Sequence, residues 1–192
     1  MEATKTPVNI YFEENPNPNS LKFVVNFMIL PTNEFYDFTN MESAKDSPLA
    51  QELFTYPFVK EVFFMSNFVT ITKEDDTEWF EVRNSIKSHI QNFLESGKSV
   101  VDDSIEPIKP SNKENSELDN QIISILDEYI KPAVESDGGA ISFHSFNEGI
   151  VKVVLQGSCS GCPSSTVTLK AGIENLLKSM MPEVISVESI EE

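Results

Sequence analysis

The chain has 192 residues, which allows one domain or two small ones, and 40% of them are hydrophobic, including 14 phenylalanines. That composition can fill a core and argues against a disordered protein. The net charge of −17 disfavours nucleic acid and anionic membranes as partners, because both would repel such a surface. No apolar run approaches the roughly 20 residues that span a bilayer, so no membrane association is expected.

The first 96 residues are predicted to form a domain of mixed strands and helices. Alternating or β-rich apolar residues predict strands, and helical spacing of apolar residues predicts helices. Strands are predicted at residues 8–12, 21–29, 59–64 and 68–72, and helices around residues 49–53 and 79–94. The pair Ser66-Asn67 between the last two strands predicts a hairpin turn. Nothing in this region has the spacing of metal ligands or catalytic groups.

Residues 97–116 are predicted to be a flexible linker. The segment contains Pro107 and Pro110 among serines, asparagines and charged residues, and no helical or strand period runs through it. The sequence therefore predicts a domain over residues 1–96 and a second domain over residues 117–192.

The second region reads as helix, two strands, helix and strand. Ser116 and Asp119 resemble a capping box at the start of a helix that stops or kinks near Pro132. The run Asp137-Gly138-Gly139 is interpreted mainly as a helix stop, with a positive φ at glycine. The later elements are predicted as strands at 141–146 and 150–155, a helix whose apolar face runs from Leu169 to Met180, and a strand at 184–190. The predicted fold class is α+β, with two small mixed domains joined by a flexible linker and the order α-β-β-α-β in the second.

The chain has two cysteines, Cys159 and Cys162, in one loop between a predicted strand and a predicted helix, and this loop is predicted to lie at the surface. Pro163 suits the first position of the helix, which makes Cys162 the expected N-cap. Free N–H groups and the positive end of the helix dipole would favour the thiolate there, and thiolate is the form that binds metal. Gly157 and Gly161 would let the backbone curl so that N–H groups point at sulfur.

An iron–sulfur cluster of the [4Fe–4S] or [2Fe–2S] type needs four cysteine ligands, and one chain supplies two. His89 and His144 stand alone in predicted secondary structure and are not expected to be ligands. The simplest way to complete the four ligands is a two-fold dimer in which each chain contributes Cys159 and Cys162. Three other interpretations remain from the residues alone: an ordinary pair of thiols, a dithiol oxidoreductase, and a zinc ion held across a dimer.

Residues 117–192 resemble the C-terminal domain of NifU and the Nfu proteins, which bind and transfer iron–sulfur clusters. The stretches that carry the resemblance are Asp137-Gly138-Gly139, the cysteine loop from Gly157 to Ser165, the run from Thr168 to Glu174, and Pro182-Glu183-Val184. Residues 8–95 are similar to the N-terminal domain of Nfu proteins through Asn15–Phe23, Ser47–Ala50, Val62–Phe64 and Phe68–Thr72. Three positions depart from the usual pattern, namely Met65, Lys131 and Ala140, and none of them is a predicted ligand.

The resemblance implies a cluster carrier or scaffold that is not an enzyme and has no catalytic residue. Cys159 and Cys162 would bind the cluster, with [4Fe–4S] favoured and [2Fe–2S] possible, in a homodimer that forms on cluster binding. The implied partners are apo iron–sulfur client proteins and an upstream assembly scaffold. Since residues 1–7 show neither an apolar signal core nor an Arg-rich presequence, a cytoplasmic protein of the bacterial type is expected.

Overall fold

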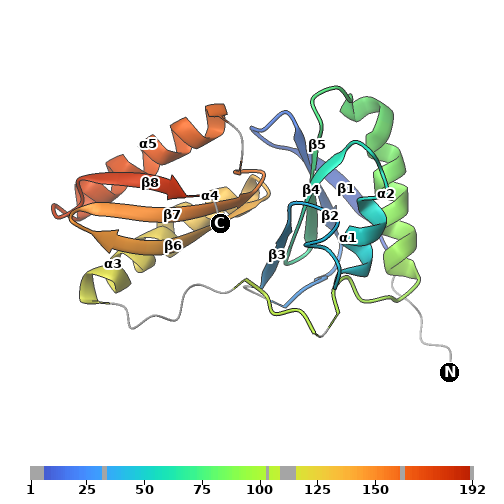
Figure 1. The fold of residues 1–192 in the computed structure, drawn as a ribbon, viewed down its shortest axis with the longest axis horizontal. Coiled ribbons are helices and arrows are strands. Elements are labelled where there is room, and N and C mark those ends of the chain that lie inside the picture. The colour runs from blue at the N-terminus through green and yellow to red at the C-terminus, as the bar shows by residue number, and fades with distance from the viewer. Residues whose placement is uncertain (1–6, 32–33, 103, 109–115, 161–162, 191–192) are drawn as a thin grey trace. The chain divides into compact units, whose positions relative to one another are not determined.

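The computed structural model describes residues 7–31, 34–102, 104–108, 116–160 and 163–190 (Figure 1). The chain divides into two compact units, residues 1–14 with 19–107 and residues 15–18 with 108–192. Both units combine strands and helices, which confirms the predicted α+β class. The domain limits at residues 96 and 117 stay predictions.

The N-terminal unit is a five-stranded antiparallel sheet in the order β1-β2-β5-β4-β3. Helices α1 and α2 cover one face of this sheet (Figure 1). The elements are β1 (Ile10–Glu14), β2 (Ser20–Val25), β3 (Phe35–Phe38), α1 (Pro48–Leu53), β4 (Val59–Met65), β5 (Phe68–Lys73) and α2 (Trp79–Glu95). The hairpin predicted around Ser66-Asn67 is confirmed, and Ser66 takes a positive φ of 49° in its turn.

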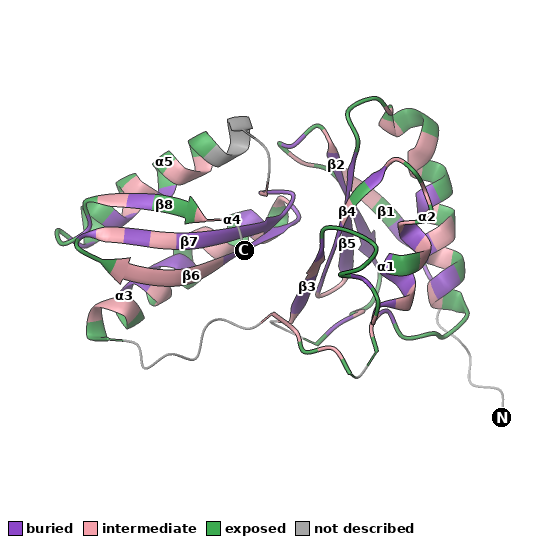
Figure 2. Ribbon diagram, viewed as in Figure 1, coloured by how far each residue is buried: buried purple, intermediate pink, exposed green. Residues whose placement is uncertain are grey.

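Alternate residues of the central strands face the helices and form the core of this unit. Phe23 of β2, Phe64 of β4 and Ile71 of β5 are fully buried there, together with Ile86 and Ile90 of α2. Figure 2 shows buried stripes along α2 between exposed ones, as the helical period of its apolar residues predicts. Burial of each such side chain contributes about 1.5–3 kcal/mol, so this layer holds the unit together.

Two details of the N-terminal unit differ from the sequence prediction. Strand β2 ends at Val25, and the alternation that continues to residue 29 belongs to a loop in which Met28 is 52% exposed. The N–H groups of Ile29 and Leu30 bond the carbonyl of Ser66, so this loop closes over the hairpin turn. Strand β3 was not predicted, because its four residues are too few for a clear period.

The start of the predicted linker, residues 97–116, packs against the N-terminal unit. Val100 is 4% exposed in the core of this unit, and its carbonyl accepts a hydrogen bond from Ser47 Oγ at 2.7 Å. The N–H of Asp102 bonds the carbonyl of Asp46 at 2.8 Å. Residues 100–102 are thus held by the segment that leads into α1.

The C-terminal unit has the predicted order α-β-β-α-β, with its first helix in three parts. Its elements are α3 (Glu117–Ile125), the π-helix η1 (Leu126–Ile130), α4 (Lys131–Ser136), β6 (Gly139–Asn147), β7 (Ile150–Gly157), α5 (Pro163–Met180) and β8 (Ser186–Ile190). The sheet order is β6-β7-β8, antiparallel between β6 and β7 and parallel between β7 and β8. Among the residues with described structure, no helix is both long and apolar enough to cross a bilayer.

Of the two outcomes predicted near Pro132, a stop or a kink, the stop is wrong, because the helix continues beyond this residue. The capping box at Ser116 and Asp119 is confirmed, with the Asp119 N–H bonded to Ser116 Oγ at 3.1 Å. The chain then passes through the π-helical turn η1 and continues as α4, with Pro132 in its first turn. Pro132 has no N–H to donate to the turn before it, and a π-helical turn is a recognised cause of a bend.

The core of the C-terminal unit lies between its sheet and its helices. Val151 and Val153 of β7 alternate toward this core, and Ile173 and Leu177 of α5 meet them with no exposed surface. The same cluster includes Cys159. The sheet and α5 therefore position the segment that carries the first predicted ligand.

Candidate functional site

The cysteine loop follows the carboxyl end of β7 and leads into α5. Helix α5 begins at Pro163, as predicted from the favourable position of proline in a first helical turn. Residues 161 and 162 lie outside the described residues. The N-cap role of Cys162 and its distance from Cys159 therefore remain predictions.

Cys159 is described, and it is buried. Its side chain is 5% exposed and packs in the core of the C-terminal unit, whereas the sequence predicted a loop at the surface. The inward direction follows from the turn before it, where Gly157 has a positive φ of 64° and the N–H of Ser160 bonds the carbonyl of Gly157 at 3.0 Å. Gly157 supplies the left-handed conformation that other residues avoid.

Ser158 ties the cysteine loop to the end of α4. It is 2% exposed, and its Oγ donates a hydrogen bond to the carbonyl of Asp137. Its N–H bonds the carbonyl of Gly138 at 3.3 Å, and its Oγ lies 3.8 Å from the sulfur of Cys159. The position of Cys159 is thus coupled to the Asp137-Gly138-Gly139 segment.

The interpretation of Asp137-Gly138-Gly139 as a helix stop is confirmed for Gly138 only. Gly138 has a positive φ of 82°, and its N–H bonds the carbonyl of Glu135 at 3.0 Å as the helix ends. Gly139 has no positive φ and already belongs to β6, where it pairs with Gly157. A helix stop needs one such glycine, so the second glycine was the sequence feature that pointed to a further role.

The two histidines lie in separate hydrogen-bonded settings. His89 lies between Tyr56, whose hydroxyl is 3.1 Å from Nδ1, and Glu52, whose carboxylate is 3.0 Å from Nε2. His144 contacts Ser145 Oγ at 3.1 Å, where the register between β6 and β7 shifts. Within the described ranges, no group of three or more His, Cys, Asp or Glu side chains could hold a metal ion.

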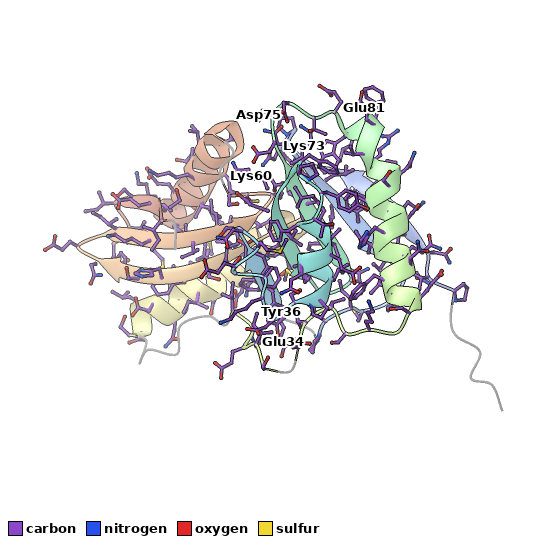
Figure 3. The ribbon with its side chains drawn as sticks, turned by 45° about the vertical axis from the view of Figure 1, so that its right-hand side comes forward. Glu34, Tyr36, Lys60, Lys73, Asp75 and Glu81 are labelled. Carbon is purple, nitrogen blue, oxygen red and sulfur yellow. The ribbon has the colours of Figure 1, made fainter. Side chains whose placement is uncertain are left out.

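Charged residues of the N-terminal unit take part in local contacts. Lys73 and Asp75 lie close together in Figure 3, and both side chains bond Asn19, at 3.1 Å and 2.5 Å. Figure 3 also shows Glu34 near Tyr36, where burial, followed by the charge of Glu34, raises the pKa of Tyr36. These contacts join residues within the N-terminal unit.

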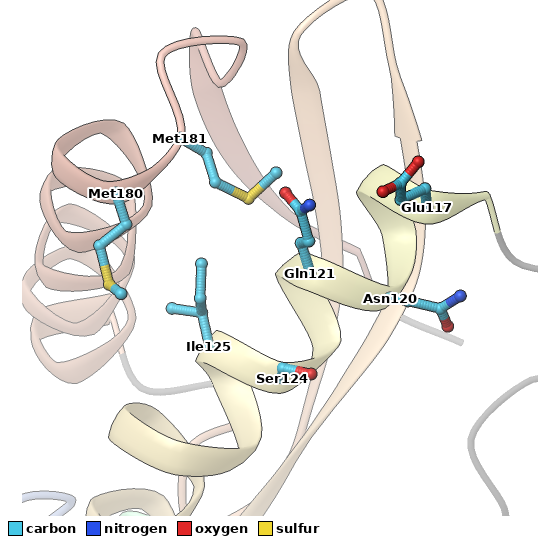
Figure 4. Close-up of a pocket in the computed structure, with 7 residues that line it drawn as sticks. All are labelled: Glu117, Asn120, Gln121, Ser124, Ile125, Met180 and Met181. Carbon is cyan, nitrogen blue, oxygen red and sulfur yellow. The ribbon is translucent and has the colours of Figure 1, made fainter.

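An open groove of about 700 Å³ lies between α3 and the end of α5 (Figure 4). Met181, just after the end of α5, is buried in the core, while Met180 is 46% exposed at the groove. Ile125 completes its apolar part, and Glu117 lies at the start of α3. Since α5 has 18 residues at about 1.5 Å each, this groove is about 27 Å along the helix from the cysteine loop. It is therefore not part of the cysteine site.

Two family descriptions match the chain. "Scaffold protein Nfu/NifU N terminal" matches residues 10–97, and "NifU-like domain" matches residues 122–188. The second range contains both cysteines of the sequence.

Curated relatives match along nearly the whole chain. The "NFU1 iron-sulfur cluster scaffold homolog, mitochondrial" of Drosophila sechellia is 40% identical over 190 residues, which are 98% of this chain and 67% of that protein. The human protein of the same name is 40% identical over 96% of this chain and 74% of its own length. A solution structure of a NifU-like protein from Saccharomyces cerevisiae has a TM-score of 0.47 and 24% identity, and the match covers 54% of this chain and 92% of that one.

The expectation of a cytoplasmic protein is wrong in the light of these relatives, which are named as mitochondrial. It rested on the lack of a presequence pattern in residues 1–7. That was weak ground, because the match covers 67% of the Drosophila sechellia protein, so the first residues of this chain do not report on targeting.

Proposed function

Because this chain belongs to the Nfu family of iron–sulfur cluster scaffold proteins, we propose that it binds a cluster through Cys159 and Cys162 of two copies and transfers it to apo-proteins. The preferred cluster is [4Fe–4S]. The protein acts as a carrier without turnover, and a mitochondrial location is proposed from the names of its relatives. An upstream assembly scaffold would supply the cluster.

The observation that carries this proposal is the position of Cys159 at the carboxyl end of β7, immediately before α5. The start of a helix offers free N–H groups and the positive end of the helix dipole, and both favour a thiolate beside it. Two thiolates per chain leave a four-cysteine cluster half ligated, so a second copy completes it. Each copy then contributes the same pair of residues across a two-fold axis.

Cluster loading in this scheme requires the cysteine loop to open. Cys159 is 5% exposed, and a thiolate shared with a second chain must reach the surface. The positive φ of Gly157 and the turn bond from the Ser160 N–H hold the loop in its buried form, so opening would have to change both. Cys159 is thus kept away from solvent, which also disfavours the oxidoreductase alternative, since reactive dithiols are partly exposed.

The ligand assignment is tested by single substitutions in the full chain. Cys159→Ala and Cys162→Ala each remove two of the four ligands from a symmetric dimer, so each variant should lose stable iron and sulfide after anaerobic reconstitution. Gly172→Ala in α5, where an added Cβ meets no atom within 4 Å, is the control and should retain both. Circular dichroism confirms that each variant is folded. Iron content near that of the wild type in either cysteine variant contradicts the assignment.

A further inference from the structure

Gly139 lies where a side chain has no room. A Cβ atom built on Gly139 would be 2.5 Å from the carbonyl oxygen of Gln156 and 3.0 Å from the sulfur of Cys159. It would also be 3.3 Å from Cys159 Cβ. A separation under 3.0 Å is not tolerated, and the nearest atom belongs to the backbone, so an added methyl group must move β7, the cysteine or both.

Two other glycines of this unit show whether Gly139 is needed for its backbone conformation or for the space that its missing side chain leaves. Gly138 provides a positive φ of 82°, whereas Gly139 has none, so only space explains a glycine at 139. Gly172, in the middle of α5, has nothing within 4 Å of an added Cβ. It is therefore a matched glycine of the same unit at which a methyl group meets no atom.

The contacts around Gly139 lead directly to the cysteine loop. Gly139 pairs with Gly157, and the preceding Gly138 and Asp137 hold Ser158 through its N–H and its hydroxyl. A shift of the Gln156 peptide would therefore carry Gly157 and Ser158 with it, and Cys159 follows them in the chain.

We propose that Gly139 is a positioning residue for Cys159: its missing side chain lets the sulfur lie against the first residue of β6. The assignment rests on the proposed function in one respect, because the position of Cys159 matters for cluster binding if Cys159 is a ligand. The contact itself is a property of the unloaded chain.

The first test measures the unloaded protein. In a Cys162→Ala background, Cys159 is the single thiol, and its alkylation by iodoacetamide reports how well it is buried. Gly139→Ala should accelerate this alkylation, while Gly172→Ala should leave it unchanged. Equal rates in the two variants, each shown to be folded by circular dichroism, would overturn the proposal.

A second variant decides the case if Gly139→Ala does not fold. Cys159→Ala removes the sulfur, which lies 3.0 Å from the added Cβ, and so gives β6 room to move. The double variant Gly139→Ala/Cys159→Ala should thus regain the circular dichroism spectrum of a folded chain. A double variant that stays unfolded would overturn the proposal.

The loaded protein separates this inference from the proposed function. With the native cysteines, Gly139→Ala should lose iron and the cluster absorption after reconstitution, whereas Gly172→Ala should retain both. Retention of a wild-type spectrum by Gly139→Ala would overturn the positioning role. If the wild type itself binds no cluster, the proposed function fails, and the alkylation rates still test the contact between Gly139 and Cys159.

Discussion

Glu174 is a single side chain that joins two elements of the C-terminal unit. Its carboxylate accepts hydrogen bonds from the Lys178 ammonium at 2.5 Å and from the N–H of Val187 in β8 at 3.0 Å. The bond from Lys178, followed by the bond from Val187, lowers the pKa of Glu174 below its ordinary value of 4.5. The glutamate in the run from Thr168 to Glu174 therefore has a structural role in holding α5 to β8.

The Glu174 carboxylate makes the stability of this unit depend on pH. Because its pKa is lower in the folded chain, ionised Glu174 stabilises the fold fully above the unfolded value and loses this effect as the pH falls through the folded value. The stability difference between wild type and Glu174→Gln should thus shrink from about pH 6 to about pH 3. Far-UV circular dichroism of urea unfolding measures it. A difference that stays constant with pH would contradict the role.

The place of Cys159 after a strand and the start of α5 at Pro163 could be predicted, because both follow from neighbouring residues of the sequence. The burial of Cys159 and the role of Gly139 could not, since both depend on which residues of β6 and β7 lie opposite one another. In the sequence, Asp137-Gly138-Gly139 is typical of a turn. Only the pairing of β6 with β7 shows that Gly139 leaves room for the sulfur of Cys159.

At the level of elements, the segment after α2 stabilises the start of α1. Ser47 is the N-cap of α1, accepting a hydrogen bond from the Ala50 N–H at 3.2 Å, and its hydroxyl donates to the carbonyl of Val100. One buried side chain thus closes a helix end and holds a segment that the sequence assigned to a linker.

Ser47→Ala should destabilise the N-terminal unit by about 1–3 kcal/mol, because it removes an N-cap and leaves a buried carbonyl without its donor. Trp79 is the one tryptophan of the sequence and packs against the core of this unit, so its fluorescence follows the unfolding of this unit in the intact chain. Ser88→Ala, on the exposed side of α2, is the control and should change stability little. Equal effects of the two substitutions would refute the role of Ser47.

Most elements of the fold could be predicted because they carry a clear period or a recognisable end. The helix cap at Ser116 and the hairpin at Ser66-Asn67 are examples. The π-helical turn before Pro132 could not be predicted. The spacing of apolar residues looks the same whether the helix ends there or continues through one turn with i→i+5 hydrogen bonds. The end of β2 at Val25 was missed because apolar residues continue into the loop.

For the whole molecule, a cluster shared between two chains should be easier to give away than one enclosed in a single chain. Thiolates of an acceptor can replace the four ligands one at a time, as in thiol–disulfide exchange. A loaded protein mixed with an apo-enzyme of the [4Fe–4S] class should therefore activate it even when a strong iron chelator is present. Activation that disappears with the chelator would show that iron passes through solution.

Cluster binding should promote dimerisation of this chain, because a ligand that binds only the dimer favours the dimer by mass action. The most direct measurement is the native mass spectrum of the reconstituted protein. It should show a dimer of two 21.6-kDa chains that share a single cluster. Cys159→Ala should abolish this dimeric species. A single chain that carries a complete cluster would contradict the account.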